Sequence, residues 1–372
     1  MLVSHRQAES ETVRVRPLAE RHSKHRFEEI RTDPDDPTPD AGGLVAQLDQ
    51  LADRIRRARA CGASVLLCYG AHLIKNGLGP VVADLLRGGW ITHLATNGAG
   101  VIHDWEYAFH GRSEEDVRVN VADGTFGAWD ETGRYTLMAI AVGATHGMGY
   151  GESMGRLVRE GGLRVPEREA LQQQLRAWLQ APVGDEHAGA ATDLLRCMIA
   201  GQWDEGWIPI DHSMAQISLT ATADALRIPL TVHPGIGYDI VYVHPQADGA
   251  VFGRAAGIDF RVLCQSVYEL GTAGVVMSVG SAVTAPQVFE KAASVANNLR
   301  RQHGEDAISP YIAVNDLQPA TWDWSNGEPP ASEADYYLRF LKSFSRVAPE
   351  PLNYLGADNR LVLLNLHQRL MD

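Results

Sequence analysis

The chain has 372 residues, of which 45% are hydrophobic and 21% are charged, a composition typical of a folded globular protein rather than a disordered one. Its formal net charge of −13 argues against nucleic acid or an anionic membrane as a partner, because both require a basic surface. The sequence contains neither an apolar run long enough to cross a bilayer nor a signal-peptide core, so we expect a cytoplasmic protein.

Residues 1–41 are expected to form a flexible N-terminal arm. The segment 32–40 carries three prolines and four aspartates, which oppose both helix and strand. Apolar residues then recur at helical spacing over 44–60, and Gly62 ends the predicted helix. The four cysteines lie far apart without a CxxC pair, so the sequence predicts neither a metal site nor a disulfide framework.

The stretch from Val65 to Glu106 is the predicted centre of the active site. It indicates a strand over 65–68, a glycine-bearing turn, a helix over 79–87, a strand over 91–95, and a loop over 96–100 that opens into another helix. Parallel strands joined by a helix collect ligands at their carboxyl ends. Glycine there admits close backbone approach, and helix N-termini favour anions.

The rest of the chain continues this alternation. Residues 113–200 are expected to be mostly helical and peripheral, and a second series of strands and helices begins near Ile208. Its predicted strands lie over 229–232, 274–280 and 311–314. Apolar strands alternating with helices indicate a parallel sheet covered on both faces. The predicted fold class is therefore α/β, with a doubly wound, Rossmann-like parallel sheet in a domain over 42–310 and a C-terminal segment, 311–372, packed on it.

Three segments resemble the deoxyhypusine synthase family. AHLIKNG (71–77) is similar to the cofactor turn of that family, and THLATNGAGVIHD (92–104) is similar to its glycine- and acid-bearing loop. IPLTVHPGIGYDIVYV (228–243) is similar to a strand followed by a loop with glycine and aspartate. Their order and spacing agree over residues 60–300. The resemblance implies a Rossmann-like NAD-binding domain and a homotetramer with active sites at subunit interfaces.

The chain departs from this family at the lysine that forms an imine with the aminobutyl group. The corresponding stretch, 274–286, has Ser281 and Ala282 where glycines are expected, and no lysine precedes Lys291. Of the paired acids in the second loop, only Asp104 is retained. The sequence therefore indicates a divergent bacterial branch that acts on a small polar substrate, such as an amine, a sugar or a polyol.

The candidate catalytic residues carry a proton or hold a polar group at predicted strand ends. Histidine titrates near neutrality, so His103, followed by Asp104 and Glu106, is the predicted acid/base centre. Asp239 is predicted to anchor a polar or cationic group, and His233 lies near it in sequence. The alternatives are first-turn acids favoured by a helix dipole, an aspartate of an ordinary turn and a core histidine.

The resemblance also implies which residues contact NAD. They are His72, Lys75, Asn76, Asn97, Gly98, Ala99, Gly100, Gly280 and Ser281. Lys75 is expected to place a cation against the cofactor pyrophosphate, and its alternative is a surface lysine at a helix start. For Ser281 the alternative is an ordinary helix N-cap.

These observations predict an NAD-dependent enzyme of a transferase or isomerase type. It would take a hydride from a carbon bearing an amine or hydroxyl, allow transfer, elimination or epimerisation, and return the hydride. Two alternatives stay open: an aminobutyl transferase that uses Lys75 or Lys291, and a non-catalytic NAD-binding protein. We expect a small-molecule substrate, a homotetramer, and no nucleic-acid or membrane partner.

Overall fold

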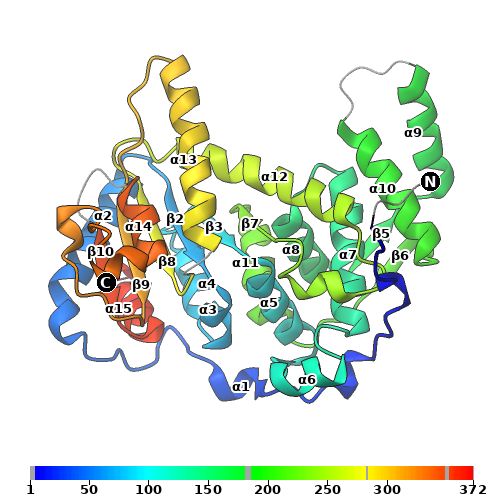
Figure 1. Cartoon of the computed structure of the whole chain (residues 1–372), viewed down its shortest axis with the longest axis horizontal. Helices are drawn as coiled ribbons and strands as arrows, with labels where there is room; N and C mark the ends of the chain where they lie inside the picture. Colours follow the sequence, from blue (N-terminus) through cyan, green and yellow to red (C-terminus); the bar gives the residue numbers. More distant parts are fainter. Residues whose placement is uncertain (1–4, 181–185, 282–283, 348–351, 372) are drawn as a thin grey trace.

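The computed structural model describes residues 5–180, 186–281, 284–347 and 352–371. At its centre lies a six-stranded sheet in the order β10-β9-β8-β2-β3-β7, whose pairings are all parallel (Figure 1). The strands are β2 (Val65–Tyr69), β3 (His93–Thr96), β7 (Leu230–Val232), β8 (Val275–Val279), β9 (Tyr311–Asp316) and β10 (Asn353–Gly356). Numbered within the sheet, this order is 3-2-1-4-5-6, the strand order of the Rossmann fold. The predicted fold class is confirmed.

Helices cover both faces of this sheet. One face carries α2 (Val45–Ala60), α4 (Gly79–Arg87) and α15 (Asn359–Met371), and the other carries α12 (Gly249–Tyr268), α13 (Thr284–Gln302) and α14 (Arg339–Ser345). Val65, Leu67 and Tyr69 of β2 belong to the first apolar cluster, whereas Leu66 and Cys68 belong to the second. Since successive side chains of a strand point to opposite faces, a continuous apolar run such as VLLCY is what a sheet buried on both sides requires.

The helix after β3 positions the residues predicted as the acid/base centre. This helix, α5 (Gly98–His110), begins at Asn97, whose side chain accepts a hydrogen bond from the Gly100 amide, and ends at Gly111 in a left-handed conformation. A short helix, α3 (Ala71–Lys75), follows β2 and packs against α5. The loops after β2 and β3 are therefore short, and each leads directly into a helix.

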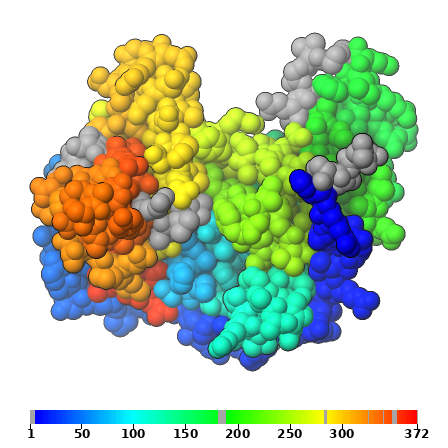
Figure 2. Space-filling view, viewed as in Figure 1, coloured from blue at the N-terminus to red at the C-terminus, as the bar shows by residue number. Residues whose placement is uncertain are grey.

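A mostly helical layer extends the molecule beyond β7 (Figure 1). It contains α7 (Asp130–Thr145), α8 (Tyr150–Glu160), α9 (Arg168–Gln180), α10 (Glu186–Ala200) and α11 (Leu219–Leu226). A small two-stranded antiparallel sheet of β5 (Gly162–Val165) and β6 (Gly206–Pro209) lies within it and was not predicted from the sequence. Figure 2 shows that α13 on one side and the α9–α10 pair on the other project from the body, with the surface hollowed between them above α12.

The segment expected to be a flexible arm makes defined contacts with the body. Leu18 and Phe27 are buried in the main apolar cluster, and Arg21 forms a buried ion pair with Glu106. Strand β1 (His25–Arg26) pairs antiparallel with β4 (Arg112–Ser113). Residues 16–30 thus lie against α5 and the start of α7, and farther along the segment the Thr32 amide donates to the Gly77 carbonyl and the Asn365 side chain donates to the Pro39 carbonyl.

The remaining elements are short. They are the helices α1 (Phe27–Ile30) and α6 (Val117–Asp123), and the 3-10 turns Ser10–Thr12, Leu18–Glu20, Gly42–Leu44, Ala215–Ile217, Ile240–Val243, Trp324–Asn326 and Ala334–Tyr337. Within the ranges that the structure covers, we find no helix that is both long and apolar enough to cross a membrane.

Candidate functional site

A cleft of about 490 Å³ lies at the carboxyl end of the sheet. Residues at or after the carboxyl ends of β2, β3, β8, β9 and β10 line it: Gly70, Ala71, His72, Asn76, Asn97, Gly280, Ser281, Asn315, Asp316, Leu317, Gln318, Ala357, Asp358 and Asn359. The winding of the sheet reverses between β2 and β8, and ligands of doubly wound sheets bind outside the carboxyl ends of the strands at such a point. We call this cavity the switch-point cleft.

Two glycines bring the loops after β2 and β8 into contact in the switch-point cleft. A Cβ atom at Gly70 would lie 2.2 Å from the carbonyl oxygen of Gly280, and Gly280 itself has a φ of +58°. Any larger residue at position 70 would push the two loops apart, and an L side chain at position 280 would be strained. The two glycines therefore allow the loops after β2 and β8, the first and fourth strands of the Rossmann order, to pack closely together.

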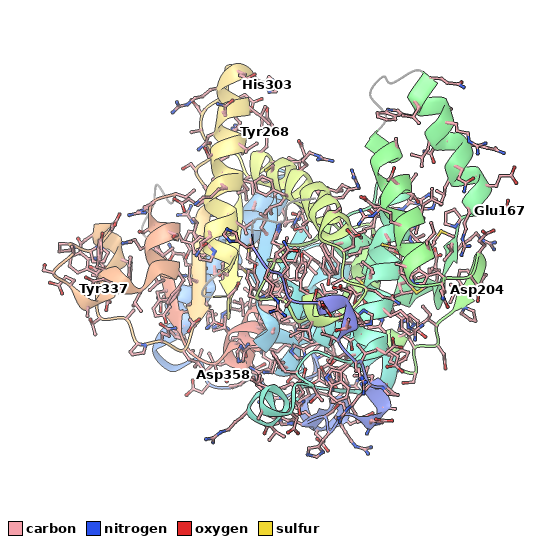
Figure 3. All side chains as sticks on the ribbon, turned by 45° about the vertical axis from the view of Figure 1, so that its right-hand side comes forward. Glu167, Asp204, Tyr268, His303, Tyr337 and Asp358 are labelled. Carbon is pink, nitrogen blue, oxygen red and sulfur yellow. The ribbon has the colours of Figure 1, made fainter. Side chains whose placement is uncertain are left out.

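The polar wall of the switch-point cleft comes from asparagines and aspartates. Asn315 donates both amide protons, to the carbonyl oxygens of Leu355 at 2.8 Å and Ala357 at 2.7 Å, which fixes the orientation of its side chain. The Asn76 amide donates to the Asn359 side-chain oxygen at 2.7 Å. Asp316 and Asp358 add carboxylates, and the described lining contains no arginine or lysine (Figure 3 labels Asp358). This wall suits ligand groups that donate hydrogen bonds.

A smaller pocket adjoins the switch-point cleft and shares Ser281 with it. Its other lining residues are Cys68, Ala95, Thr96, His233, Leu263, Ala285, Val288 and Phe289. The His233 amide donates to the Thr96 carbonyl at 2.8 Å, and its ring Nε2 lies 3.0 Å from the Thr231 hydroxyl. Burial lowers the pKa of His233 to about 4, so the ring is neutral at pH 7. A neutral imidazole beside the cleft is able to accept a proton.

Asp239 is buried against the start of α5 and does not line the switch-point cleft. A Cβ atom at Gly98 would lie 2.1 Å from the Asp239 Oδ1, so glycine at position 98 is what allows this contact. The carboxylate accepts a hydrogen bond from the Gly235 amide at 2.9 Å. Burial raises the pKa of Asp239 to about 6, and that hydrogen bond partly opposes the rise.

The predicted acid/base centre on α5 is bound by groups of the protein itself. The Asp104 carboxylate accepts hydrogen bonds from the Ser218 hydroxyl at 2.8 Å and from the Leu219 amide at 2.8 Å, at the start of α11. Burial raises the pKa of Asp104, and these hydrogen bonds oppose the rise. Asp104 therefore serves as a cap for another helix.

Glu106 and His103 belong to a second buried network beside α5. Arg21 donates to both oxygens of Glu106, at 2.7 and 2.6 Å, and the Ser113 hydroxyl donates to Glu106 at 2.5 Å. Burial opposes ionisation of Glu106, but the Arg21 guanidinium outweighs it and lowers the pKa of the carboxyl. His103 Nδ1 lies 2.6 Å from the Ser113 hydroxyl, and burial lowers its pKa to about 4. Neither Glu106 nor His103 lines the switch-point cleft.

The structure divides the predicted NAD contacts into two groups. Those that line the switch-point cleft are His72, Asn76, Asn97, Gly280 and Ser281. Gly98, Ala99 and Gly100 lie in the first turn of α5, outside the lining. The Lys75 ammonium points to Glu114, 2.9 Å from its carboxylate. Among the predicted residues, the cleft thus brings together side chains that follow β2, β3 and β8.

Sequence reasoning did not find the wall after β9 and β10. Asn315, Asp316, Asp358 and Asn359 belong to it. The first pair was within reach, because polar residues directly follow the predicted strand over 311–314. The second pair was not, because the strand that places them, β10, was not predicted.

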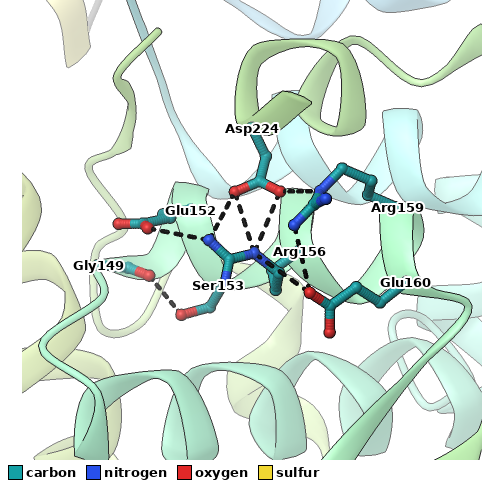
Figure 4. Close-up of polar contacts among 7 residues, drawn as sticks. All are labelled: Gly149, Glu152, Ser153, Arg156, Arg159, Glu160 and Asp224. Carbon is teal, nitrogen blue, oxygen red and sulfur yellow. Dashed lines mark hydrogen bonds and ion pairs between the residues drawn. The ribbon is translucent and has the colours of Figure 1, made fainter. Parts of the chain in front are cut away.

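The structure adds no metal site, since none of its described parts gathers three or more His, Cys, Asp or Glu side chains around one point. A second large cavity, of about 630 Å³, lies at the amino end of β7. Figure 4 shows the ion cluster on its rim: Arg156 and Arg159 both donate to Asp224, whose side chain is only 3% exposed. These two arginines are thus paired within the protein.

Comparison with known proteins reveals likeness only to solved structures. No family model matches the chain, and no curated protein does. The ternary complex of AgrE with ornithine and NAD+ is 14% identical over 88% of this chain and 33% of AgrE, with a TM-score of 0.42. A conserved LOR/SDH protein from Methanococcus maripaludis S2 is 13% identical over 91% of this chain and 73% of its own, with a TM-score of 0.41.

A third similar structure is apo ArgZ, an arginine dihydrolase from the ornithine-ammonia cycle in cyanobacteria. It is 12% identical over 87% of this chain and 32% of ArgZ, with a TM-score of 0.41. The chain thus spans about a third of the length of AgrE and ArgZ. TM-scores below 0.5 carry no conclusion about activity or ligand.

The predicted membership of the deoxyhypusine synthase family is wrong. The similar structures are AgrE, ArgZ and the LOR/SDH protein, and no family model matches. The glycines that suggested the family have packing reasons of their own: Gly98 makes room for Asp239, and a Cβ atom at Gly100 would lie 2.1 Å from the Thr96 hydroxyl. The predicted transferase or epimerase class and the predicted homotetramer rested on this family, so they lose their support.

Proposed function

We propose that the switch-point cleft binds NAD and that the protein is an NAD-dependent enzyme acting on a small polar substrate. The observation that carries this proposal is the position of the cleft at the reversal of a 3-2-1-4-5-6 parallel sheet. Dinucleotides bind across the crevice at this point of the fold. The cleft uses residues from both 42–310 and 311–372, so we propose that these segments act as one unit.

The residues of the switch-point cleft fit NAD at its sugar and amide groups. The carboxylates of Asp316 and Asp358 suit ribose hydroxyls, which donate hydrogen bonds. The Oδ1 atom of Asn315 is buried without a hydrogen-bond partner among the described residues, and a ligand amide or hydroxyl is the kind of group that would satisfy it. Because Gly70 and Gly280 are glycines in contact, no side-chain atoms of theirs cover the backbone where the strand order of the sheet reverses.

The pyrophosphate would be held without a cationic side chain. Lys75 lies outside the described lining and is paired with Glu114, and that lining contains no lysine or arginine. We propose instead that the pyrophosphate lies near Asn97, the N-cap of α5, which borders the cleft where the helix dipole favours an anion. This arrangement replaces the role predicted for Lys75.

NAD, when bound, supplies an acceptor for a hydride from a carbon that bears an amine or a hydroxyl. The protein must then take up the proton that the amine or hydroxyl releases. We assign this task to His233, whose neutral ring lies in the pocket that shares Ser281 with the cleft. The acidic wall of Asp316 and Asp358 favours substrates that are neutral or positively charged.

Calorimetric titration with NAD tests this proposal. We expect the wild-type protein to bind NAD and the variant Gly70→Val to lose binding, because its side chain would collide with the Gly280 backbone. Gly43→Val is the matched control, since nothing lies within 4 Å of a Cβ atom there. Absence of NAD binding by the wild-type protein, together with absence of nicotinamide nucleotide released on denaturation, would rule the proposal out.

A further inference from the structure

A chain of hydrogen bonds runs through the core from α12 to His233. The Ser266 hydroxyl lies 2.8 Å from Nδ1 of His93, and Nε2 of His93 lies 2.9 Å from the Thr231 hydroxyl. The same hydroxyl lies 3.0 Å from Nε2 of His233. The four side chains come from α12, β3, β7 and the loop after β7, so the fold rather than local sequence brings them together.

The interior of this hydrogen-bond chain is buried and uncharged. His93 and Thr231 are 0% and 1% exposed. Burial, together with the nearby His233, lowers the pKa of His93 to about 3, and burial lowers that of His233 to about 4. At neutral pH each imidazole therefore carries a single N–H, and each hydroxyl carries a single O–H.

Counting these protons leaves two arrangements. In the first, His233 donates from Nε2 to Thr231, Thr231 donates to His93, His93 donates to Ser266, and the Nδ1 atom of His233 is an acceptor. In the second, every donor and acceptor is exchanged, and the Nδ1 atom of His233 carries a proton. Mixtures are disfavoured at the shared Thr231 hydroxyl: its one proton cannot serve both rings, and if both rings donated to its oxygen, that proton would have no acceptor among the described residues.

The two ends of the chain, His233 and Ser266, lie in different surroundings. His233 lines the small pocket that shares Ser281 with the switch-point cleft. No hydrogen bond to Nδ1 of His233 is found among the described residues, so this nitrogen is left for a ligand. Thr231 also lines the cavity of about 630 Å³ at the amino end of β7, and Ser266 is slightly exposed on α12.

We propose that Thr231, His93 and Ser266 are positioning residues that link the tautomer of His233 to the tautomer of His93. Nδ1 of His233 then alternates between proton acceptor and proton donor. This inference rests on the proposed function. If bound NAD accepted a hydride from a substrate carbon, the amine or hydroxyl proton would pass to Nδ1 of His233. The Nε2 proton of His233 would move to Thr231, the Thr231 proton to His93, the Nδ1 proton of His93 to Ser266, and the Ser266 proton to solvent. Return of the hydride reverses each transfer, and no charge remains in the core.

Nitrogen-15 NMR of histidine-labelled protein tests the coupling without cofactor or substrate, so its failure is distinguishable from a failure to bind NAD. It reports which ring nitrogen of each histidine carries the proton. Ser266→Ala removes a hydrogen bond from both arrangements, but it leaves a buried N–H of His93 unpaired only in the first. We therefore expect the tautomer ratio of His233, three hydrogen bonds away, to shift by about fivefold, or about 1 kcal/mol, towards the form with a proton on Nδ1. In Thr231→Val, which keeps the side-chain shape, adding Ser266→Ala should no longer affect His233.

The control is Thr136→Val, another buried threonine, whose hydroxyl has no partner among the described residues and lies outside the chain. It should leave both histidines unchanged. If Ser266→Ala alters only His93, or if the effect on His233 persists in the Thr231→Val background, the four groups are separate core contacts and the proposal is wrong.

Discussion

At the scale of single residues, the buried carboxylate of Glu106 on α5 stabilises the fold rather than exchanging a proton with a substrate. Glu106 is 1% exposed and is held by Arg21, Ser113 and Thr132, so each of its oxygens has partners. A carboxylate bound in this way is poorly placed to exchange a proton with a substrate. Its contribution should therefore appear in stability measurements.

The Arg21–Glu106 pair gives a stability prediction. Glu106→Ala would leave the Arg21 guanidinium buried without a counter-charge, and we expect a loss of about 3 to 5 kcal/mol of unfolding free energy in urea. Asp49→Ala is the control, because its pair with Arg369 leaves the aspartate side chain 58% exposed and should cost about 1 kcal/mol or less. Equal losses in the two variants would contradict a structural role for Glu106.

The buried histidines predict loss of stability in acid. A histidine whose pKa is lower in the folded than in the unfolded state favours folding above its unfolded pKa of about 6.5, and this contribution is lost as the pH falls towards the folded value. The histidines with pKa values lowered to about 3 or 4 are His93, His103, His110, His212 and His233. Asp239 and Asp259, with pKa values raised to about 6 and 7, act in the opposite direction but are fewer.

We therefore expect the unfolding free energy to fall between about pH 6.5 and pH 4. Each histidine contributes a slope of about 1.4 kcal/mol per pH unit within this window. His93→Gln should lower the overall stability but flatten the decline by about one such slope, measured by urea unfolding at a series of pH values. A decline as steep as that of the wild-type protein would show that His93 is not the buried neutral group described above.

At the scale of elements, buried strands were predictable and short exposed ones were not. β2 and β8 read as continuous apolar runs, and every one of their residues is buried. β10 (NYLG) has only four residues, one of them a glycine, so its strand character depends on pairing with β9. The start of α12 at Gly249 is also hard to read from the sequence, because Gly253 and Gly257 weaken the helical signal of its first turns.

The same division explains how much of the site could be predicted. Glycine-bearing loops after recognisable strands led to His72, Asn97 and Ser281, which do line the switch-point cleft. The direction of the Lys75 side chain, by contrast, could not be predicted, because it points to Glu114, which directly follows the tertiary pairing of β1 with β4. Contacts set by tertiary structure cannot be inferred from local sequence.

The join between β2 and β8 yields a prediction at this scale. Gly70→Ala should lower the melting temperature and weaken NAD binding about tenfold or more, because the added methyl group must displace the Gly280 backbone. Gly43→Ala is the matched control: it has open space and an ordinary φ, so its melting temperature should stay the same or rise slightly. Thermal unfolding and calorimetry measure both quantities. Wild-type behaviour of Gly70→Ala would show that the close contact is not needed.

At the scale of the whole molecule, charge should decide between the two nicotinamide cofactors. The chain carries a net charge of −13, and the charged residues of the switch-point cleft are Asp316 and Asp358. The additional phosphate of NADP would meet repulsion there and no basic side chain.

We expect NAD to bind at least about tenfold more tightly than NADP in calorimetric titrations. The difference should shrink as salt is added, because screening weakens the repulsion. Replacing both Asp316 and Asp358 by asparagine should narrow the gap at low salt. Equal affinities for the two cofactors would mean that the acidic wall lies away from the bound nucleotide.

The joined loops of β2 and β8 also have a consequence for biosynthesis. One wall of the switch-point cleft begins at Gly70, and the opposite wall is completed only at Asn359. A ribosome must therefore extend the chain past Asn359 before both walls exist, and the parallel pairings between distant strands form slowly. Until then the growing chain exposes unpaired strand edges, so its dependence on chaperones should be greatest just before β10 emerges from the exit tunnel.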